Sequence, residues 1–410
     1  MCPKRGDPSL RWSVSLNIAI IGSGISGLTA AYYLSKAHKV DLFEKNSRAG
    51  GHANTIELED GTPVDSGFIV LNDRNYPGLT SLLGSLNIEL HPTEMSFSLT
   101  GLPFSWCSDD FYRLRFIRSY KKLKLFKEIV RFNRLAKLGL ENLSAADWLD
   151  KNRFSELFRD AYLFPMCSAI WSSRGQTIEQ FPVRALTQFL NNHGLLNLFN
   201  RPRWFSLKGG SRAYVSQVLK TIGIDNLHLN EEVKIIREEG QVVVATQDDA
   251  RHYDLVIFAC HANETLEVLQ DLTKAESDAL SKFNYSANPT VMHFDHELMP
   301  GDTQDWASWN AVKQGGYDYV TYWMNNLQDL NTKRQVFVSI GDFPNIEPDK
   351  VVDVIDYEHP IFTQSTLEGQ DDLQDLQGSN NTYHTGAHLG FGFHEDGLQS
   401  ALRVVKWING

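Results

Sequence analysis

The chain has 410 residues, of which 42% are hydrophobic and 22% are charged, and its formal net charge is −11. This length allows two domains, the composition is that of a globular protein, and the acidic balance argues against nucleic acid as a partner. The four scattered cysteines form no Cys-x-x-Cys pair, and no apolar run reaches the about 18 residues of a membrane span. With no signal-peptide pattern at residues 1–15, we expect a cytoplasmic protein.

A glycine-rich turn follows the first expected strand. The apolar run 18–21 predicts a strand buried on both faces, and apolar residues at helical spacing from 25 to 34 predict a helix directly after it. In the motif Gly22-x-Gly24-x-x-Gly27, the first glycine permits a tight turn, the second a close pyrophosphate and the third close helix packing. We expect the diphosphate of a dinucleotide at the helix N-terminus. The expected contacts are Gly22, Ser23, Gly24, Ile25, Ser26 and Gly27.

A second buried strand is expected at 40–43, and it ends at Glu44. An acid at this spacing accepts hydrogen bonds from the hydroxyls of an adenosine ribose. The following Arg48-Ala-Gly50-Gly51 supplies further donors for the diphosphate, and its glycines leave room for a flavin. Lys45 and His52 flank these residues and are also expected at the cofactor, although His52 also suits a hydrogen-bonded loop position.

The next expected elements lead into a segment with few strand patterns. Residues 56–68, with a turn at Asp60-Gly61, predict a hairpin. From 75 to 203 the pattern is mainly helical, with one helix at 79–86 and another that begins near Ser144. We interpret this segment as an insertion.

A basic stretch at 112–137 stands out within this acidic chain. Its cations are Arg113, Arg115, Arg118, Lys121, Lys122, Lys124, Lys127, Arg131, Arg134 and Lys137. The apolar residues between them are Leu114, Phe116, Ile117, Leu123, Leu125, Phe126, Ile129, Val130 and Phe132. Two interpretations stay open: peripheral contact with an anionic membrane, or a solvated helix whose apolar face packs inward.

In the second half, Gly209-Gly210 precedes an expected helix with Val215 on its apolar side. Residues 227–236 and 241–245 predict a hairpin, and 253–260 predict another buried strand. One amphipathic helix is expected at 267–283. Aromatic-rich strands follow at 284–294, 307–309, 317–324 and 335–340, and the acidic residues 371–381 are expected to form a loop.

The C-terminal segment has a strand, a Gly386-Ala387 pair, a glycine-rich loop and a last helix. Because N–H groups at a helix start stabilise negative charge, those near Asp396, Gly397 and Leu398 are expected at the cofactor. Three histidines, His384, His388 and His394, also occur here. Their spacing fits no common metal site, so we expect no metal.

These motifs resemble the flavin amine-oxidase superfamily, and the resemblance covers nearly the whole chain. It implies FAD as the cofactor, contacts to FAD from Gly386 and His394, and an adenine contact from the backbone of Val233. It also implies an α/β fold in which three chain segments form an FAD-binding Rossmann-like domain of glutathione-reductase type, beside a mixed α+β substrate domain. The FAD segments would be 1–75, 206–265 and 379–410, and the substrate segments 76–205, mostly helical, and 266–378.

Residues 285–300, 320–328 and 390–397 resemble a bacterial group of FAD-binding oxidoreductases associated with cyclopropane- and methyl-branched fatty-acid modification. This resemblance implies an enzyme that abstracts hydride from carbon of an apolar, fatty-acyl substrate. The alternatives are a flavin amine oxidase and a non-catalytic flavoprotein partner of a lipid-modifying enzyme. Amine oxidases often have an acid directly after the Gly-Ala pair, where this chain has His388. Tyr322 and His394 are the candidate catalytic residues, each with a purely structural alternative.

Overall fold

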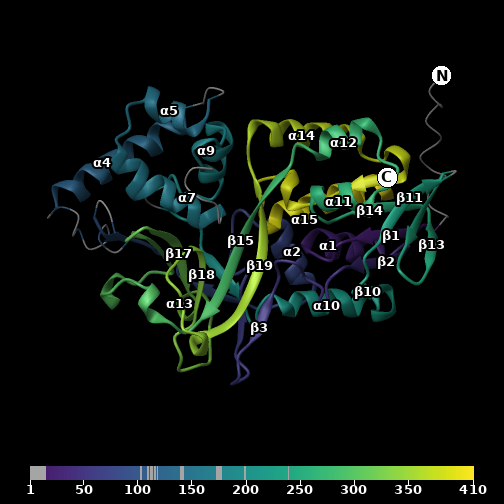
Figure 1. The fold of residues 1–410 in the computed structure, drawn as a ribbon, viewed down its shortest axis with the longest axis horizontal. Coiled ribbons are helices and arrows are strands. Elements are labelled where there is room, and N and C mark those ends of the chain that lie inside the picture. The colour runs from purple at the N-terminus through teal and green to yellow at the C-terminus, as the bar shows by residue number, and fades with distance from the viewer. Residues whose placement is uncertain are drawn as a thin grey trace. The chain divides into compact units, whose positions relative to one another are not determined.

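The computed structural model describes residues 15–101, 104–108, 110, 114, 117, 119–138, 143–171, 178–197, 200–238 and 240–410. Figure 1 shows the elements along the chain. The described residues divide into two compact units. Unit 1 comprises residues up to Gly51, Tyr214–Phe283 and Glu368–Gly410, and unit 2 comprises His52–Ala213 and Asn284–Leu367. The five domain ranges expected from the sequence stay a prediction.

A five-stranded parallel sheet forms the centre of unit 1. Its order is β10 (Leu227–Leu229), β2 (Lys39–Glu44), β1 (Asn17–Ile21), β14 (Leu255–Phe258) and β20 (Thr382–His384). Ile18 pairs with Val40 on one side and with Leu255 on the other. The side chains of Ile18 and Ile20 are fully buried, as a parallel sheet covered on both faces requires. The structure confirms the expected α/β class and the strands predicted at 18–21, 40–43 and within 253–260.

The helices of the first and last chain segments pack together in unit 1. They are α1 (Ile25–Leu34) and α15 (His394–Asn409), and both follow strands of the parallel sheet. The prediction of one helix at 267–283 is wrong in its extent. The chain instead forms α11 (Ala262–Val268) and α12 (Lys274–Leu280), because Thr273 begins a new helix with a capping box to Glu276. The α10 helix (Arg212–Ile222) follows the Gly-Gly pair as expected.

The acidic segment at 371–381 was expected to be a loop, and that prediction is wrong for most of its length. The α14 helix runs over Gln364–Leu376. Leu373 is fully buried, whereas Asp371 and Asp375 are exposed, so the helix packs one side inward and presents these acids to solvent.

A three-stranded antiparallel sheet completes unit 1, with β11 (Lys234–Glu238), β12 (Gln241–Ala245) and β13 (Ala250–Tyr253). The hairpin predicted from 227 to 245 is confirmed only for β11 and β12. Residues 227–229 instead form β10 in the parallel sheet, because Asn230, with a φ of 57°, turns the chain between the two sheets.

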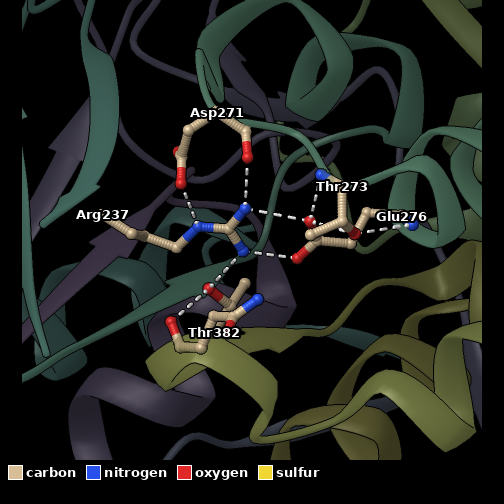
Figure 2. A network of polar contacts seen from close by, with 6 residues as sticks. Arg237, Asp271, Thr273, Glu276 and Thr382 are labelled. Carbon is tan, nitrogen blue, oxygen red and sulfur yellow. Dashed lines mark hydrogen bonds and ion pairs between the residues drawn. The ribbon is translucent and has the colours of Figure 1, made fainter.

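Arg237 joins this small sheet to two other parts of unit 1 (Figure 2). Its guanidinium donates to the Glu276 carboxylate at 2.5 and 2.9 Å, to Asp271 at 2.8 Å and to the hydroxyl of Thr382 at 3.3 Å. The side chains of Arg237 and Glu276 are almost fully buried. Such a bidentate pair fixes the orientation of both groups. Arg237 therefore holds β11, α12 and β20 together.

A seven-stranded mixed sheet forms the centre of unit 2. Its order is β19 (Val351–Ile361), β15 (Asn284–His293), β18 (Phe337–Asp342), β17 (Tyr317–Trp323), β16 (Trp309–Gln314), β7 (Phe97–Gly101) and β8 (Trp106–Cys107). All neighbours are antiparallel except β16 and β7. The long β15 and β19 lie side by side, as Figure 1 shows in green and yellow. The strands expected at 284–294, 317–324 and 335–340 are confirmed by β15, β17 and β18. The strand expected at 307–309 is misplaced, because β16 begins only at Trp309, and β19 was not predicted.

Two smaller sheets and several helices complete unit 2. The hairpin of β3 (Thr55–Glu57) and β4 (Pro63–Asp65) confirms the prediction for 56–68, and β5 (Leu71–Asn72), β9 (Trp204–Leu207) and β6 (Leu90–Thr93) form the other sheet. The helices are α2 (Pro77–Ser85), α4 (Tyr120–Leu135), α5 (Ala145–Lys151), α6 (Glu156–Phe158), the π-helix η3 (Arg159–Leu163), α7 (Phe164–Trp171), α9 (Val183–Asn192) and α13 (Met324–Leu327). Within the described ranges, none of the helices has the length and apolar character needed to cross a bilayer.

Candidate functional site

The turn between β1 and α1 depends on two of its glycines for steric reasons. Gly22 has a φ of +100°, and a Cβ atom there would lie 2.8 Å from the carbonyl oxygen of Ala259. A Cβ atom on Gly27 would overlap the carbonyl oxygen of Gly22. These two glycines therefore allow the sharp turn and the close approach of the helix to the sheet, as the sequence predicted.

Gly24 is different, because a Cβ atom there would meet no protein atom within 4 Å. Its φ of −65° is also open to any residue. Gly24 is the N-cap of α1, and no side chain of the described residues caps this helix. The first N–H groups of a helix have no acceptor within the helix. The structure thus leaves space, with donors directed toward it, where the sequence predicted a diphosphate.

Glu44 lies at the end of β2 and is almost fully buried. Its Oε2 atom accepts hydrogen bonds from the backbone N–H of Ser23 at 3.1 Å and from the Ser23 hydroxyl at 2.6 Å. Its Oε1 atom accepts from the N–H and the side-chain amide of Asn46. The four donors use the lone pairs of the carboxylate, so a ribose hydroxyl bound here would have to replace one of them. The Ser23 hydroxyl also accepts from the N–H of Gly50 at 3.3 Å and so links the two glycine turns.

The Arg48–Gly51 turn lies against the first glycine turn. The N–H of Gly50 donates to the carbonyl oxygen of Ser23 at 3.0 Å, and a Cβ atom on Gly51 would lie 3.1 Å from the Cα atom of Gly24. The Arg48 guanidinium donates to the carbonyl oxygen of Gly51 at 2.9 Å. The structure therefore brings the two predicted diphosphate segments together.

Two other predicted residues lie near the end of β2. Lys45 forms an ion pair with Glu264 at 2.5 Å, and this hydrogen bond raises the pKa of Lys45. Val233 is buried against Phe43, after a segment in which the N–H of Glu231 donates to the carbonyl oxygen of Glu44 at 3.0 Å. The Val233 backbone is thus placed beside the expected ribose site.

The start of α15 contacts the start of α1. A Cβ atom on Gly397 would lie 2.8 Å from the Ser26 hydroxyl oxygen and 2.9 Å from Cγ2 of Ile25. Residues 22–27 and 396–398, which are far apart in the sequence, therefore meet at two helix N-termini. Asp396 accepts from the N–H of Phe393 at 2.9 Å, and burial raises its pKa to about 6. Both helix dipoles place partial positive charge in this region.

Two glutamines that the sequence analysis missed hold the loop before α15. The Nε2 atom of Gln370 donates to the carbonyl oxygens of His388 and Gly390, each at 2.8 Å. The Gln377 amide accepts from the N–H of His384 and donates to its carbonyl oxygen, both at 2.9 Å. Gln370 lies just before the segment expected to be a loop and Gln377 lies within it, so no helix was expected to position them. Gln370 belongs to α14, and Gln377 directly follows its last residue, Leu376.

The three C-terminal histidines are buried at separate places. The His384 ring stacks on Phe258, and the His388 ring lies edge-on to Phe283. Burial lowers the pKa of His384 to about 4 and that of His388 to about 3. In the described part of the chain, no three His, Cys, Asp or Glu side chains are grouped in a way that would hold a metal ion. Gly386, which precedes His388, donates from its N–H to the Ser400 hydroxyl at 2.9 Å.

The two candidate catalytic residues lie in different units. In unit 1, Nε2 of His394 lies 3.1 Å from the hydroxyl oxygen of Tyr214, and burial lowers the pKa of His394 to about 3. In unit 2, the hydroxyl of Tyr322 donates to the carbonyl oxygen of Ala169 at 3.0 Å. His52 also belongs to unit 2, where its ring stacks on that of Tyr357 at 4.7 Å. The roles assigned to these residues stay predictions.

Comparison with known proteins identifies the family. A family model described as flavin containing amine oxidoreductase matches residues 25–409, which is most of the chain. The chain belongs to the flavin containing amine oxidoreductases. Its cofactor is FAD, and unit 1 fits this group, because the open space at Gly24 and the two adjacent helix N-termini suit a diphosphate and an electron-rich ring.

Similar proteins have several activities. The CLA-producing fatty acid isomerase from P. acnes superposes with a TM-score of 0.70 at 15% identity, over 96% of this chain and 99% of that chain. Cyclohexylamine oxidase from Brevibacterium oxydans IH-35A superposes with a TM-score of 0.71 at 14% identity, over 96% and 99%. These likenesses show the fold. A 4,4'-diapophytoene desaturase from Staphylococcus aureus is 43% identical over 71 residues, which are 17% of this chain and 14% of the desaturase.

Proposed function

We propose that the protein is an FAD-dependent oxidoreductase that removes a hydride from a carbon atom of an apolar, fatty-acyl substrate. We infer an uncharged substrate from the position and burial of His388. This residue follows the Gly386-Ala387 pair at the position where amine oxidases often have an acid. It is buried against Phe283, and its pKa of about 3 keeps it neutral at pH 7. An alkylammonium substrate therefore has no negative charge to attract it at this position.

The residues of unit 1 have defined tasks in this proposal. The N–H groups at the start of α1 bind the diphosphate, and Glu44 orients the ribose. The start of α15, where the helix dipole is positive, would hold the electron-rich part of FAD. When bound, FAD supplies a ring that accepts the hydride.

His394 suits a positioning role better than a proton-accepting one. A base with a pKa of about 3 holds a proton poorly at pH 7, whereas a neutral ring bonded to Tyr214 keeps a fixed orientation. Tyr322 also suits a positioning role, because its hydroxyl already donates to a backbone carbonyl oxygen.

The similar proteins support an apolar substrate without deciding it. One of them is named a fatty acid isomerase and another a diapophytoene desaturase. Desaturation removes hydrogen from two adjacent carbon atoms, and a flavin can accept one of them as a hydride, which is the proposed chemistry. Cyclohexylamine oxidase and putrescine oxidase share the fold as well, so amine oxidation is the second candidate.

Anaerobic mixing of the FAD-loaded protein with two panels of compounds tests the proposal. One panel contains fatty acids and phospholipids with unsaturated or methyl-branched chains, and the other contains primary, secondary and tertiary amines. Loss of the visible flavin absorbance on addition of a lipid supports the proposal. Bleaching by amines alone overturns it in favour of an amine oxidase. Bleaching by neither panel also overturns it and favours a non-catalytic flavoprotein. Free FAD with the same additions is the control.

A further inference from the structure

The exposed apolar side chains of unit 2 are concentrated around α4. Among the described residues of the whole chain, ten large hydrophobic side chains are exposed, and five of them lie between 114 and 138. Tyr120 is 83% exposed and Leu138 is 72% exposed, at the two ends of the helix. Isolated exposed apolar residues are ordinary, but such a concentration within one short segment marks an interaction surface.

One side of α4 packs inward and the other side faces solvent. Leu125, Ile129 and Phe132 are buried, so these apolar residues of the basic stretch belong to the core of unit 2. They cannot enter a membrane. Helical spacing places Tyr120, Lys124, Lys127 and Arg134 on the opposite side. The exposed side, here called the basic face, consists of Tyr120, Lys124, Lys127, Val130, Arg134 and Leu138. The earlier cations Arg113, Arg115 and Arg118, with Tyr112 and Phe116, lie outside the described residues.

The basic face has cations that no described acid neutralises. Lys124, Lys127 and Arg134 are exposed and have no ion pair among the described residues. The acid within α4, Glu128, is used internally, because its carboxylate accepts from the N–H and the hydroxyl of Ser155.

Two other cations of α4 are engaged within unit 2. Lys122 is paired with Asp110 at 2.6 Å, and the Arg131 guanidinium lies over the Phe154 ring. The free positive charge of α4 therefore gathers on the basic face, in a chain whose net charge is −11.

We propose that the basic face docks on bilayers that contain anionic phospholipid. Cations are attracted to the headgroups, and an exposed tyrosine and aliphatic side chains between and beside them reach the interfacial region. The apolar contribution distinguishes this occupant from nucleic acid, which a cationic face alone would also attract. This surface is independent of the proposed reaction, since it lies outside the FAD-binding residues.

Co-sedimentation of the full FAD-loaded chain with vesicles tests the proposal. We expect binding to vesicles of phosphatidylcholine mixed with phosphatidylserine, weaker binding as salt is raised, and none to phosphatidylcholine alone. The triple variant Lys124→Glu/Lys127→Glu/Arg134→Glu should weaken binding by about a hundredfold, since each cation near an anionic surface contributes about a fivefold change. Tyr120→Ser/Leu138→Ser should weaken it as well.

A charge-matched variant on other exposed lysines, Lys220→Glu/Lys333→Glu/Lys406→Glu, is the control and should bind far better than the triple variant. An unchanged visible flavin spectrum and circular dichroism show that each variant is folded. Equal binding to both kinds of vesicle, equal losses in the two triple variants, or binding to duplex DNA but not to vesicles would each overturn the proposal.

Discussion

The Nε2 atom of His394 lies 3.1 Å from the hydroxyl oxygen of Tyr214, and both side chains are buried. His394 is the first residue of α15, and Tyr214 belongs to α10. Because burial lowers the pKa of His394 to about 3, the ring is neutral at pH 7, and the Tyr214 hydroxyl helps to fix its orientation. The contact therefore fixes the beginning of the helix that we assign to the flavin.

Replacement of Tyr214 by phenylalanine removes only the hydroxyl. We expect Tyr214→Phe to lower the free energy of unfolding by about 1–3 kcal/mol, since a buried ring nitrogen loses its partner. Urea unfolding measures this loss. Tyr383→Phe is the control, because the structure records no hydrogen bond of the Tyr383 hydroxyl among the described residues. Equal losses in the two variants would contradict the importance of the pair.

The open space at Gly24 predicts a variant that folds but binds FAD poorly. Gly24→Val fills that space at a φ that any residue adopts, so the folded state should lose no more than about 1 kcal/mol through the weaker N-cap. FAD affinity should fall at least about tenfold, because the side chain occupies the place of the diphosphate. Isothermal titration of the apoprotein with FAD measures it.

Two other glycine variants serve as comparisons for Gly24→Val. Gly22→Ala, at a φ of +100° and close to Ala259, should destabilise the fold itself. Gly84→Ala, in α2 with open space around it, should neither lower the stability of the fold nor change FAD binding. Wild-type FAD affinity in Gly24→Val would refute the assignment of the cofactor site.

Gln370 of α14 should support cofactor binding indirectly. Gln370→Ala removes the two hydrogen bonds to the carbonyl oxygens of His388 and Gly390, and we expect FAD affinity to fall by about threefold to tenfold as the loop loosens. Gln374→Ala on the exposed side of the same helix is the matched control. Fluorescence titration with FAD compares the variants, and indistinguishable affinities would show that the loop is held by other contacts.

The Arg237 network should contribute strongly to stability. Arg237→Met leaves Glu276 buried without its partner, and we expect a loss of about 3–5 kcal/mol. Lys274 and Asp278 on the same α12 helix form an exposed pair at 2.9 Å, so Lys274→Ala should cost less than about 0.5 kcal/mol. Thermal and urea unfolding measure the loss of stability in both variants. Similar losses in Arg237→Met and Lys274→Ala would argue against a buried network.

Buried neutral histidines predict the direction of the pH dependence. His293, His384, His388 and His394 have pKa values of about 3 to 4, lowered by burial. Below pH about 6.5 the unfolded chain binds protons at these groups and the folded chain does not, so stability falls as the pH decreases. Each histidine contributes a loss of about 2 kcal/mol between pH 7 and pH 5. Asp65 and Asp396, whose pKa values are raised to about 6, oppose the trend in part.

Urea unfolding at a series of pH values checks this expectation. His384→Phe keeps the contact with Phe258 and removes one titrating group, so the slope should become shallower. The exposed His252→Gln is the control and should leave the slope unchanged. Stability that is constant from pH 7 to pH 5 would contradict the prediction.

Local patterns in the sequence were sufficient to predict the first chain segment of unit 1. Gly22, Gly24 and Gly27 lie between a buried strand and a helix, and each has a steric or electrostatic reason that acts within a few residues. In unit 2, alternating aromatic residues predicted β15, β17 and β18, but β19 and the strands β5 to β9 were not predicted. The segment at 371–376 was not, because one buried leucine in an acidic run gives too weak a periodic signal to identify a helix.

The sequence by itself determined the dinucleotide motif, the acid at the end of the second strand and the family, because these depend on short spacings along the chain. Only the tertiary structure decided that Gly397 contacts Ser26, that Gln370 holds the loop after Gly386, and that Tyr214 meets His394. It also decided which residues of the basic stretch face solvent. These relationships join residues that are distant along the chain, and they depend on how elements pack, which no local periodicity encodes.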